Sequence, residues 1–118
     1  MSDYKDLNVW QKSIDFVEMV YRIVSSFPRE EIYALSDQLK RAVVSIPSNI
    51  AEGASRNSNK EFVQFLYIAL GSASEVETQL IIAQRLNYIN SIENELIELT
   101  SIRKMLNSLI SSIKRKIQ

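Results

Sequence analysis

The side chains best placed to do chemistry in this chain are the lysines and arginines near its C-terminus. After Glu98 the sequence contains five cations and no acidic residue: Arg103, Lys104, Lys114, Arg115 and Lys116. Clustered cations can contact the phosphates of RNA or DNA. Cations near the C-terminal end of a helix also complement its macrodipole, so the pattern has a purely structural explanation as well. The residues alone leave both interpretations open.

A second candidate is a polar stripe on one helical face. Counting 100° per residue brings six side chains together: Gln38, Arg41, Ser45, Asn49, Glu52 and Arg56. Ser45 and Asn49 are poor helix formers in an interior, which indicates hydrogen bonds beyond those of the helix itself. An ordinary solvated face is the alternative. We predict a subunit or ligand contact through five of the six: Arg41, Ser45, Asn49, Glu52 and Arg56.

Seven cations of these two patterns, together with Lys40 beside Arg41, could contact nucleic acid. Eight cations are candidates: Lys40, Arg41, Arg56, Arg103, Lys104, Lys114, Arg115 and Lys116. The chain carries 14 basic and 14 acidic residues, so its formal net charge is zero and the whole surface does not attract nucleic acid. Binding must therefore come from local clustering, which a symmetric oligomer would multiply into a basic ring or lumen.

Catalysis has little support in the sequence. The chain has no histidine and no cysteine, which excludes serine–histidine relays, thiol nucleophiles and zinc sites built on those residues. Glu75 and Glu77 lie on different faces of a straight helix, and Glu95 with Glu98 has no histidine beside it. We predict a protein that is not an enzyme and has no cofactor or metal. A reaction that needs only carboxylates, tyrosine or lysine is the remaining enzymatic alternative.

The elements that must position these residues are helices. With 118 residues, 46% of them apolar, the chain fits one globular domain, residues 1–118. Two glycines and two prolines leave little turn chemistry for a β-protein. Apolar residues recur at steps of three and four, and they predict helices over about residues 7–27, 35–54, 59–87 and 91–117. Short connections between them favour an all-α, antiparallel up-down-up-down four-helix bundle.

Prolines and glycines punctuate this pattern. Pro28 ends the first helix, and Pro47 predicts a kink in the second, with a break into two helices as the alternative. Gly53 stands where a left-handed C-terminal cap is expected. Gly71 weakens a helix interior, so a close approach of another helix is expected there.

Capping residues set the other boundaries. Ser58 and Glu61 have the spacing of a capping box at the start of the third helix. Asn87 can adopt the left-handed conformation at its end. Asn90 and Glu93 repeat the N-terminal signature before the fourth helix.

The sequence also bears on location. The start of the chain is polar and mixed in charge, unlike a signal peptide, and no apolar run approaches the roughly 18 residues of a membrane span. Absence of cysteine suits a reducing compartment. We therefore expect a cytoplasmic protein without a membrane partner.

Three segments resemble a known family. The run Arg41-Ala42-Val43-Val44-Ser45-Ile46-Pro47-Ser48-Asn49-Ile50-Ala51-Glu52-Gly53-Ala54-Ser55-Arg56 is similar to the signature of the four-helix-bundle proteins encoded in intervening sequences of 23S ribosomal RNA genes. Residues 4–10 resemble that family's opening segment, and residues 62–75 its third helix. The resemblance covers most of residues 4–89, while the C-terminal helix is generic.

The resemblance implies a compact up-down bundle that assembles into a homopentamer around a central channel. It also implies kinship with the accessory variability determinant proteins of diversity-generating retroelements, which share that barrel and associate with nucleic acid. It carries over no catalytic residue. Two hypotheses follow: a homo-oligomer, expected to be a pentamer, that binds RNA or DNA weakly, and a scaffold that binds another protein and no nucleic acid.

Overall fold

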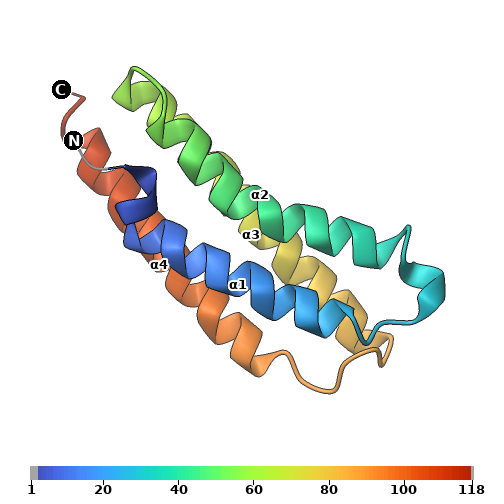
Figure 1. Cartoon of the computed structure of the whole chain (residues 1–118). Coiled ribbons are helices and arrows are strands. Elements are labelled where there is room, and N and C mark those ends of the chain that lie inside the picture. Colours follow the sequence, from blue (N-terminus) through green and yellow to red (C-terminus); the bar gives the residue numbers. More distant parts are fainter. Residues whose placement is uncertain (1–2, 118) are drawn as a thin grey trace.

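Within residues 3–117, four antiparallel helices form the molecule. A computed structural model describes residues 3–117. Two short 3-10 segments, η1 (Tyr4–Asp6) and η2 (Arg29–Glu31), accompany the four α-helices. These are α1 (Asn8–Val24), α2 (Leu35–Ala54), α3 (Asn59–Arg85) and α4 (Glu93–Lys114). Successive helices run in opposite directions, and both chain ends lie at the same end of the bundle (Figure 1). The predicted up-down-up-down bundle is confirmed.

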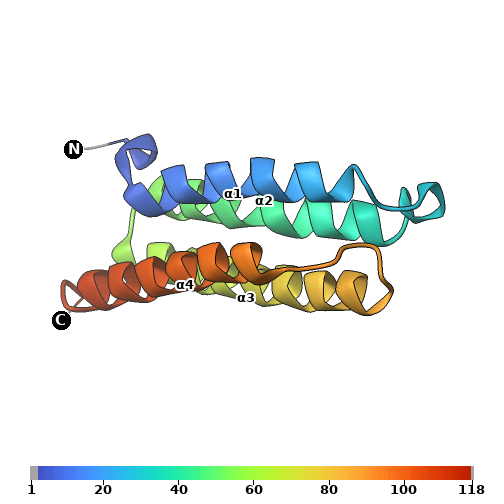
Figure 2. The same ribbon diagram turned by 90° about the horizontal axis from the view of Figure 1, so that it is seen from below.

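The helices lie in two layers. Figure 2 shows α1 beside α2 in one layer and α4 beside α3 in the other. The described chain measures 48 × 24 × 20 Å, and a single apolar core runs along its length. Each helix contributes fully buried side chains, among them Phe16, Leu39, Leu66 and Leu106. Within residues 3–117, no helix is at once long and apolar enough to cross a membrane.

Both predicted local caps of α3 are present. Ser58 is the N-cap, and its hydroxyl accepts a hydrogen bond from the Glu61 backbone N–H at 3.1 Å. At the other end Asn87 has a φ of 64°, the left-handed conformation that closes a helix. The Tyr88 N–H then reaches back to the Ala83 carbonyl at 2.9 Å, completing a Schellman motif. Local side-chain chemistry therefore fixes where α3 begins and ends.

Three other boundaries differ from the prediction, and one of them is the end of α4, which lies at Lys114 and not near residue 117. α1 ends at Val24, before Phe27, because the chain tightens there and the Ser25 and Ser26 hydroxyls donate to carbonyls one turn back. α4 has Ile92 as its N-cap, so the predicted cap at Asn90 is wrong. Ser91 takes part of that role, since its hydroxyl accepts from the Glu93 N–H at 3.3 Å.

α2 continues through Pro47 as one helix, and it bends near its middle (Figure 1). The alternative of two separate helices is therefore wrong. Pro47 is buried, so contacts of its ring with the core offset the backbone hydrogen bond that proline cannot make.

Neither glycine has the predicted role. Gly53 lies inside α2 with a negative φ, so it is not a left-handed cap. A Cβ added there would lie 2.7 Å from the Phe65 Cβ, so Gly53 permits close packing of α2 on α3. Gly71 is the reverse case, because an added Cβ would meet nothing within 4 Å. Within residues 3–117 no helix approaches Gly71, and that expectation is wrong.

The connections at the far end of the bundle are tied together. The Tyr88 hydroxyl, after α3, donates to the Glu31 carboxylate at 2.7 Å. Glu31 also accepts from the Leu35 N–H at 3.1 Å, where α2 begins. The hydrogen bond to Glu31 raises the pKa of Tyr88, because the phenol donates to a carboxylate and burial and the nearby negative charges add to the effect.

Candidate functional site

The polar stripe of α2 borders α3 along the outside of the bundle. Its ends carry ion pairs within α2: the Arg41 guanidinium lies 3.2 Å from Asp37, and Arg56 lies 2.9 Å from Glu52. The four-residue spacing of Glu52 and Arg56 suits an ion pair along one helical face. Exposed pairs of this kind contribute about 0.5 kcal/mol or less. The ends of the stripe are therefore available to solvent or a partner, with part of their charge already neutralised.

The residues in the middle of the stripe form hydrogen bonds within α2 and to α3. The Asn49 amide donates to both the carbonyl and the hydroxyl oxygen of Ser45, each at 2.8 Å. Ser72 of α3 donates to the same Ser45 hydroxyl at 2.8 Å. Ser72 is buried, while Ser45 and Asn49 are half-buried. The hydrogen bonds expected of Ser45 and Asn49 therefore exist, and one of them joins α2 to α3.

Replacing Asn49 with aspartate tests this network without changing its shape. An aspartate places a carboxylate oxygen against the Ser45 carbonyl in place of the amide donor, so two acceptors face each other at a half-buried position. We expect Asn49→Asp to destabilise the fold by about 2 kcal/mol. The measurement is urea unfolding, with Ser48→Asp as the control because Ser48 is exposed on the same helix. Equal stability of the two variants would contradict a structural role for Asn49.

A shallow groove lies beside this network between α2 and α3. It is lined by Gln38, Arg41, Ala42, Ser45, Glu75 and Gln79. The Gln79 side-chain oxygen is covered yet has no hydrogen-bond partner among residues 3–117. A buried acceptor without a donor is costly, and a donor from outside the chain relieves that cost only when the Gln79 side chain turns toward the groove. The groove is the part of the stripe that best suits a partner.

The eight candidate phosphate contacts do not form one patch. Arg56, Lys114, Arg115 and Lys116 lie at the end of the bundle that holds both chain termini, where α2 and α4 finish (Figure 2). Lys60 in the first turn of α3 joins them, and sequence reasoning missed it. We call these five residues the basic end. Lys40, Arg41, Arg103 and Lys104 lie away from it, along the helices.

Aromatic rings of α3 accompany two cations of the basic end. The Arg56 guanidinium lies 4.9 Å from the centre of the Phe65 ring. The Lys114 ammonium lies 5.1 Å from the centre of the Tyr67 ring and donates to its hydroxyl at 2.7 Å. Such contacts hold long side chains in place at exposed sites. Residues from three helices are thereby brought together at the basic end.

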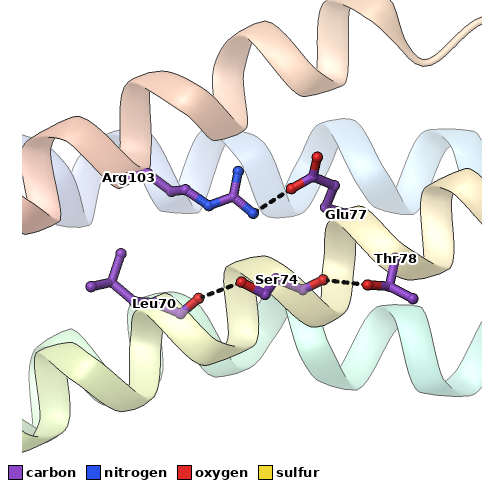
Figure 3. Close-up of polar contacts among 5 residues, drawn as sticks. All are labelled: Leu70, Ser74, Glu77, Thr78 and Arg103. Carbon is purple, nitrogen blue, oxygen red and sulfur yellow. Dashed lines mark hydrogen bonds and ion pairs between the residues drawn. The ribbon is translucent and has the colours of Figure 1, made fainter.

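Arg103 forms an ion pair between two helices of the bundle. Its guanidinium pairs with Glu77 of α3, and this pair joins α4 to α3 (Figure 3). Figure 3 also shows Ser74 and Thr78 of α3, whose hydroxyls donate to the carbonyls of Leu70 and Ser74 one turn back. Arg103 is therefore the weakest of the eight phosphate candidates, because its ion pair joins two helices and is less exposed than the Arg41–Asp37 and Arg56–Glu52 pairs.

Two more candidate cations stand alone. Lys40 lies over the Tyr21 ring of α1, with its ammonium 5.1 Å from the ring centre. Lys104 is exposed in the middle of α4. Neither residue forms an ion pair within residues 3–117. Each could contact a phosphate only singly.

The carboxylates do not assemble into a reactive centre. Glu77 pairs with Arg103, and Glu98 lies 2.9 Å from Lys12 of α1. In the part of the chain that the structure describes, no three acidic side chains are grouped so that they could hold a metal ion. These two carboxylates therefore hold helices together.

The outward side of α3 exposes apolar residues that the core stripe did not include. Tyr67 is 48% exposed and Ile68 51% exposed near one end. Ile81 and Ile82 are exposed about four turns later. Between them lie three small residues, Gly71, Ser74 and Thr78, and the exposed carboxylate of Glu75 borders them. We call the seven residues other than Glu75 the α3 outer face. The sequence did contain a signal for this face, because Ile68 and Ile82 do not fall on the helical positions at which the core residues of α3 recur.

Comparisons with known proteins agree with this fold. A family model described as 23S rRNA-intervening sequence protein matches residues 5–108. Among solved structures, the chain is similar to the crystal structure of a protein of unknown function from the S23 ribosomal protein family of Bacteroides thetaiotaomicron VPI-5482. The two are 31% identical with a TM-score of 0.76, over 86% of this chain and 97% of that one. The comparison with curated proteins found no match.

Proposed function

Because the chain belongs to the 23S rRNA-intervening sequence protein family, we propose that it is a non-catalytic protein that assembles with copies of itself and contacts nucleic acid weakly. The observation that supports assembly is the α3 outer face. The observation that supports contact with nucleic acid is the basic end. Contact with nucleic acid depends on self-assembly, because assembly multiplies the few cations of each copy.

The α3 outer face has the composition of a helix-packing surface. Gly71 costs about 1 kcal/mol in a helix interior relative to alanine, and no contact within the described chain offsets that cost. A helix of a second copy could approach closely there and cover the exposed rings and isoleucines at either end. Exposed apolar groups around a small-residue centre support an interface more than a solvent-facing surface.

The assembly we propose is a closed ring. A face that packs against a different face of the next copy forms a ring when the rotation closes. The resemblance to the intervening-sequence proteins favours five copies around a central channel. In such a ring the basic ends repeat around the axis, which gives a locally basic surface although each chain has zero net charge.

Replacing Ile82 with lysine tests the ring. A charge placed in a desolvated apolar contact is costly, so Ile82→Lys should weaken association through α3 at least tenfold. Sedimentation would show the wild-type chain as a ring several times its 13.6 kDa mass and the variant as smaller species. Tyr33→Lys is the control, since Tyr33 is 95% exposed outside α3. A wild-type chain that sediments as a monomer would refute the ring.

Contact with nucleic acid is the second part of the proposal. Phosphate contacts release counterions, so the association constant must fall as salt rises. We would measure affinity for a mixed-sequence single strand at two salt concentrations. Absence of binding at low salt, or binding indifferent to salt, would contradict phosphate contacts.

The alternative is a scaffold that binds another polypeptide through the groove beside the α2 stripe. The unpaired Gln79 oxygen supports this alternative, because a donor from a partner would satisfy it. The two functions predict different responses when the basic end is altered.

A further inference from the structure

We propose that the outward side of α4 is a second, independent contact between copies of this chain, in which the α4 helices of two copies pack antiparallel about a two-fold axis. The surface is a shallow depression lined by six residues of α4: Glu93, Leu96, Ile97, Thr100, Ser101 and Lys104. We call it the α4 patch.

The centre of the α4 patch is apolar. Ile97 is 60% exposed, more than any other isoleucine or leucine of the described chain. It lies on the side of α4 opposite Leu99, Ile102 and Leu106, which are fully buried in the core. Ile97 therefore cannot be covered by its own bundle. Leu96 beside it is half-buried and extends the apolar surface toward the core.

The two ends of the α4 patch carry opposite charges. Glu93 lies at one end and Lys104 at the other, and neither forms an ion pair within residues 3–117. Other α4 charges are already used: Glu98 pairs with Lys12, and Arg103 pairs with Glu77. Glu93 and Lys104 are thus unpaired charges that border the exposed isoleucine, while Glu95, which is also unpaired, lies about 160° around the helix from Ile97.

This arrangement is complementary to itself. Glu93 and Lys104 are eleven residues apart, about 17 Å along a helix. A second α4 running in the opposite direction places its Lys104 against Glu93 and its Glu93 against Lys104. Ile97 of each copy then faces Thr100 of the other. One helix with these two charges and one central apolar residue therefore satisfies both sides of a two-fold contact, which closes at two copies.

The occupant is a second copy because the patch supplies both halves of the charge pattern. Two rings, or two single bundles, could join in this way without using the α3 outer face. The contact therefore does not depend on the ring proposed above.

Single cysteines test the contact directly, since the chain has none of its own. With the axis midway between residues 98 and 99, the two copies of residue 100 are offset by about 5 Å along the helices, and those of residue 111 by about 38 Å. We expect Thr100→Cys to form covalent dimers with a short bifunctional maleimide. Ser111→Cys, exposed on the same helix, is the control and should stay monomeric. Equal cross-linking of the two variants would overturn the proposal.

Charge exchange provides a second test in solution. Glu93→Lys or Lys104→Glu alone places like charges at both ends of the contact, and should weaken dimerisation about tenfold. The double variant E93K/K104E restores opposite charges and should return to within about threefold of the original affinity. A double variant as weak as the two single ones would overturn the two-fold geometry.

Both tests are repeated in the Ile82→Lys variant, which separates this contact from the ring. Persistence of the Thr100→Cys dimer in that variant supports the α4 contact whether or not the ring exists. Loss of the dimer only when Ile82 is changed would show that cross-linking followed from the ring, and the α4 contact would be wrong.

Discussion

Replacing Gly53 with alanine is expected to destabilise the bundle by about 2 kcal/mol. The added Cβ would lie 2.7 Å from the Phe65 Cβ and 2.9 Å from the Phe62 Cδ1, both on α3. The first of these atoms is fixed to the backbone, so α2 and α3 would have to move apart. Overpacking of this kind costs up to about 3 kcal/mol, and the better helix propensity of alanine offsets about 1.

Gly71 offers a matched control for this substitution. Alanine there meets open space, so it should gain the helix propensity of about 1 kcal/mol without a clash. The two Gly→Ala variants should therefore differ by about 3 kcal/mol in urea unfolding, with opposite signs relative to the parent chain. Both are made in the Ile82→Lys variant, so that association through α3 does not contribute. A Gly53→Ala variant as stable as its parent would show that α2 and α3 can separate without cost.

Reversing the charges of Lys114, Arg115 and Lys116 is expected to weaken binding of a single-stranded nucleic acid more than a hundredfold at low salt. Each lost phosphate contact removes about 0.7 from the slope of log affinity against log salt, so the slope should fall by about 2. Charge reversal adds repulsion to that loss. Affinity of the triple variant K114E/R115E/K116E at two salt concentrations measures both quantities.

The control variant has the same net charge as the triple variant, but its substitutions lie at the opposite end of the bundle. Three arginines lie at the end of the bundle far from the chain termini: Arg22 near the end of α1, Arg29 in η2 and Arg85 at the end of α3. Reversing all three changes the net charge of the chain by the same amount as the K114E/R115E/K116E variant. An equal loss in this control would show that overall charge, and not the basic end, governs binding. The neutral variant K114Q/R115Q/K116Q checks that acidic residues at the end of α4 have not unfolded the helix, whose macrodipole they oppose.

The same triple variant discriminates the two proposed functions. If the protein is a scaffold, capture of its protein partner should be unchanged, because the groove around Gln79 lies between α2 and α3, away from the basic end. If the protein contacts nucleic acid through the basic end, only nucleic-acid binding should fail. If the triple variant kept both its protein partner and its nucleic-acid binding, the basic end would be refuted as a functional surface.

Much of the fold could be predicted because it depends on neighbours in the sequence. The rhythm of three and four residues gives the helices, and Ser58 with Glu61 gives the start of α3. Asn87 gives its end. Each of these interactions joins residues within one or two turns, so the pattern of residue types contains the information needed.

The candidate site could be predicted only in part. Sequence reasoning identified Ser45 and Asn49 as unusual and expected them to make hydrogen bonds, which they do. It also grouped Arg103 with the phosphate-binding candidates, whereas the fold pairs Arg103 with Glu77. It did not include Lys60 or the exposed isoleucines of α3, because both lie outside the stripes that define the core.

The sequence by itself determined a four-helix bundle, the two caps of α3 and a run of cations without acidic residues after Glu98. Only the tertiary structure decided what individual residues do. Gly53 lets α3 pack closely against α2, Gly71 faces open space, and the Ser45 hydroxyl accepts a hydrogen bond from Ser72. The physical reason is the distance along the chain. Lys114 and Tyr67 are 47 residues apart, so their contact depends on the relative positions of two whole helices and not on any local pattern.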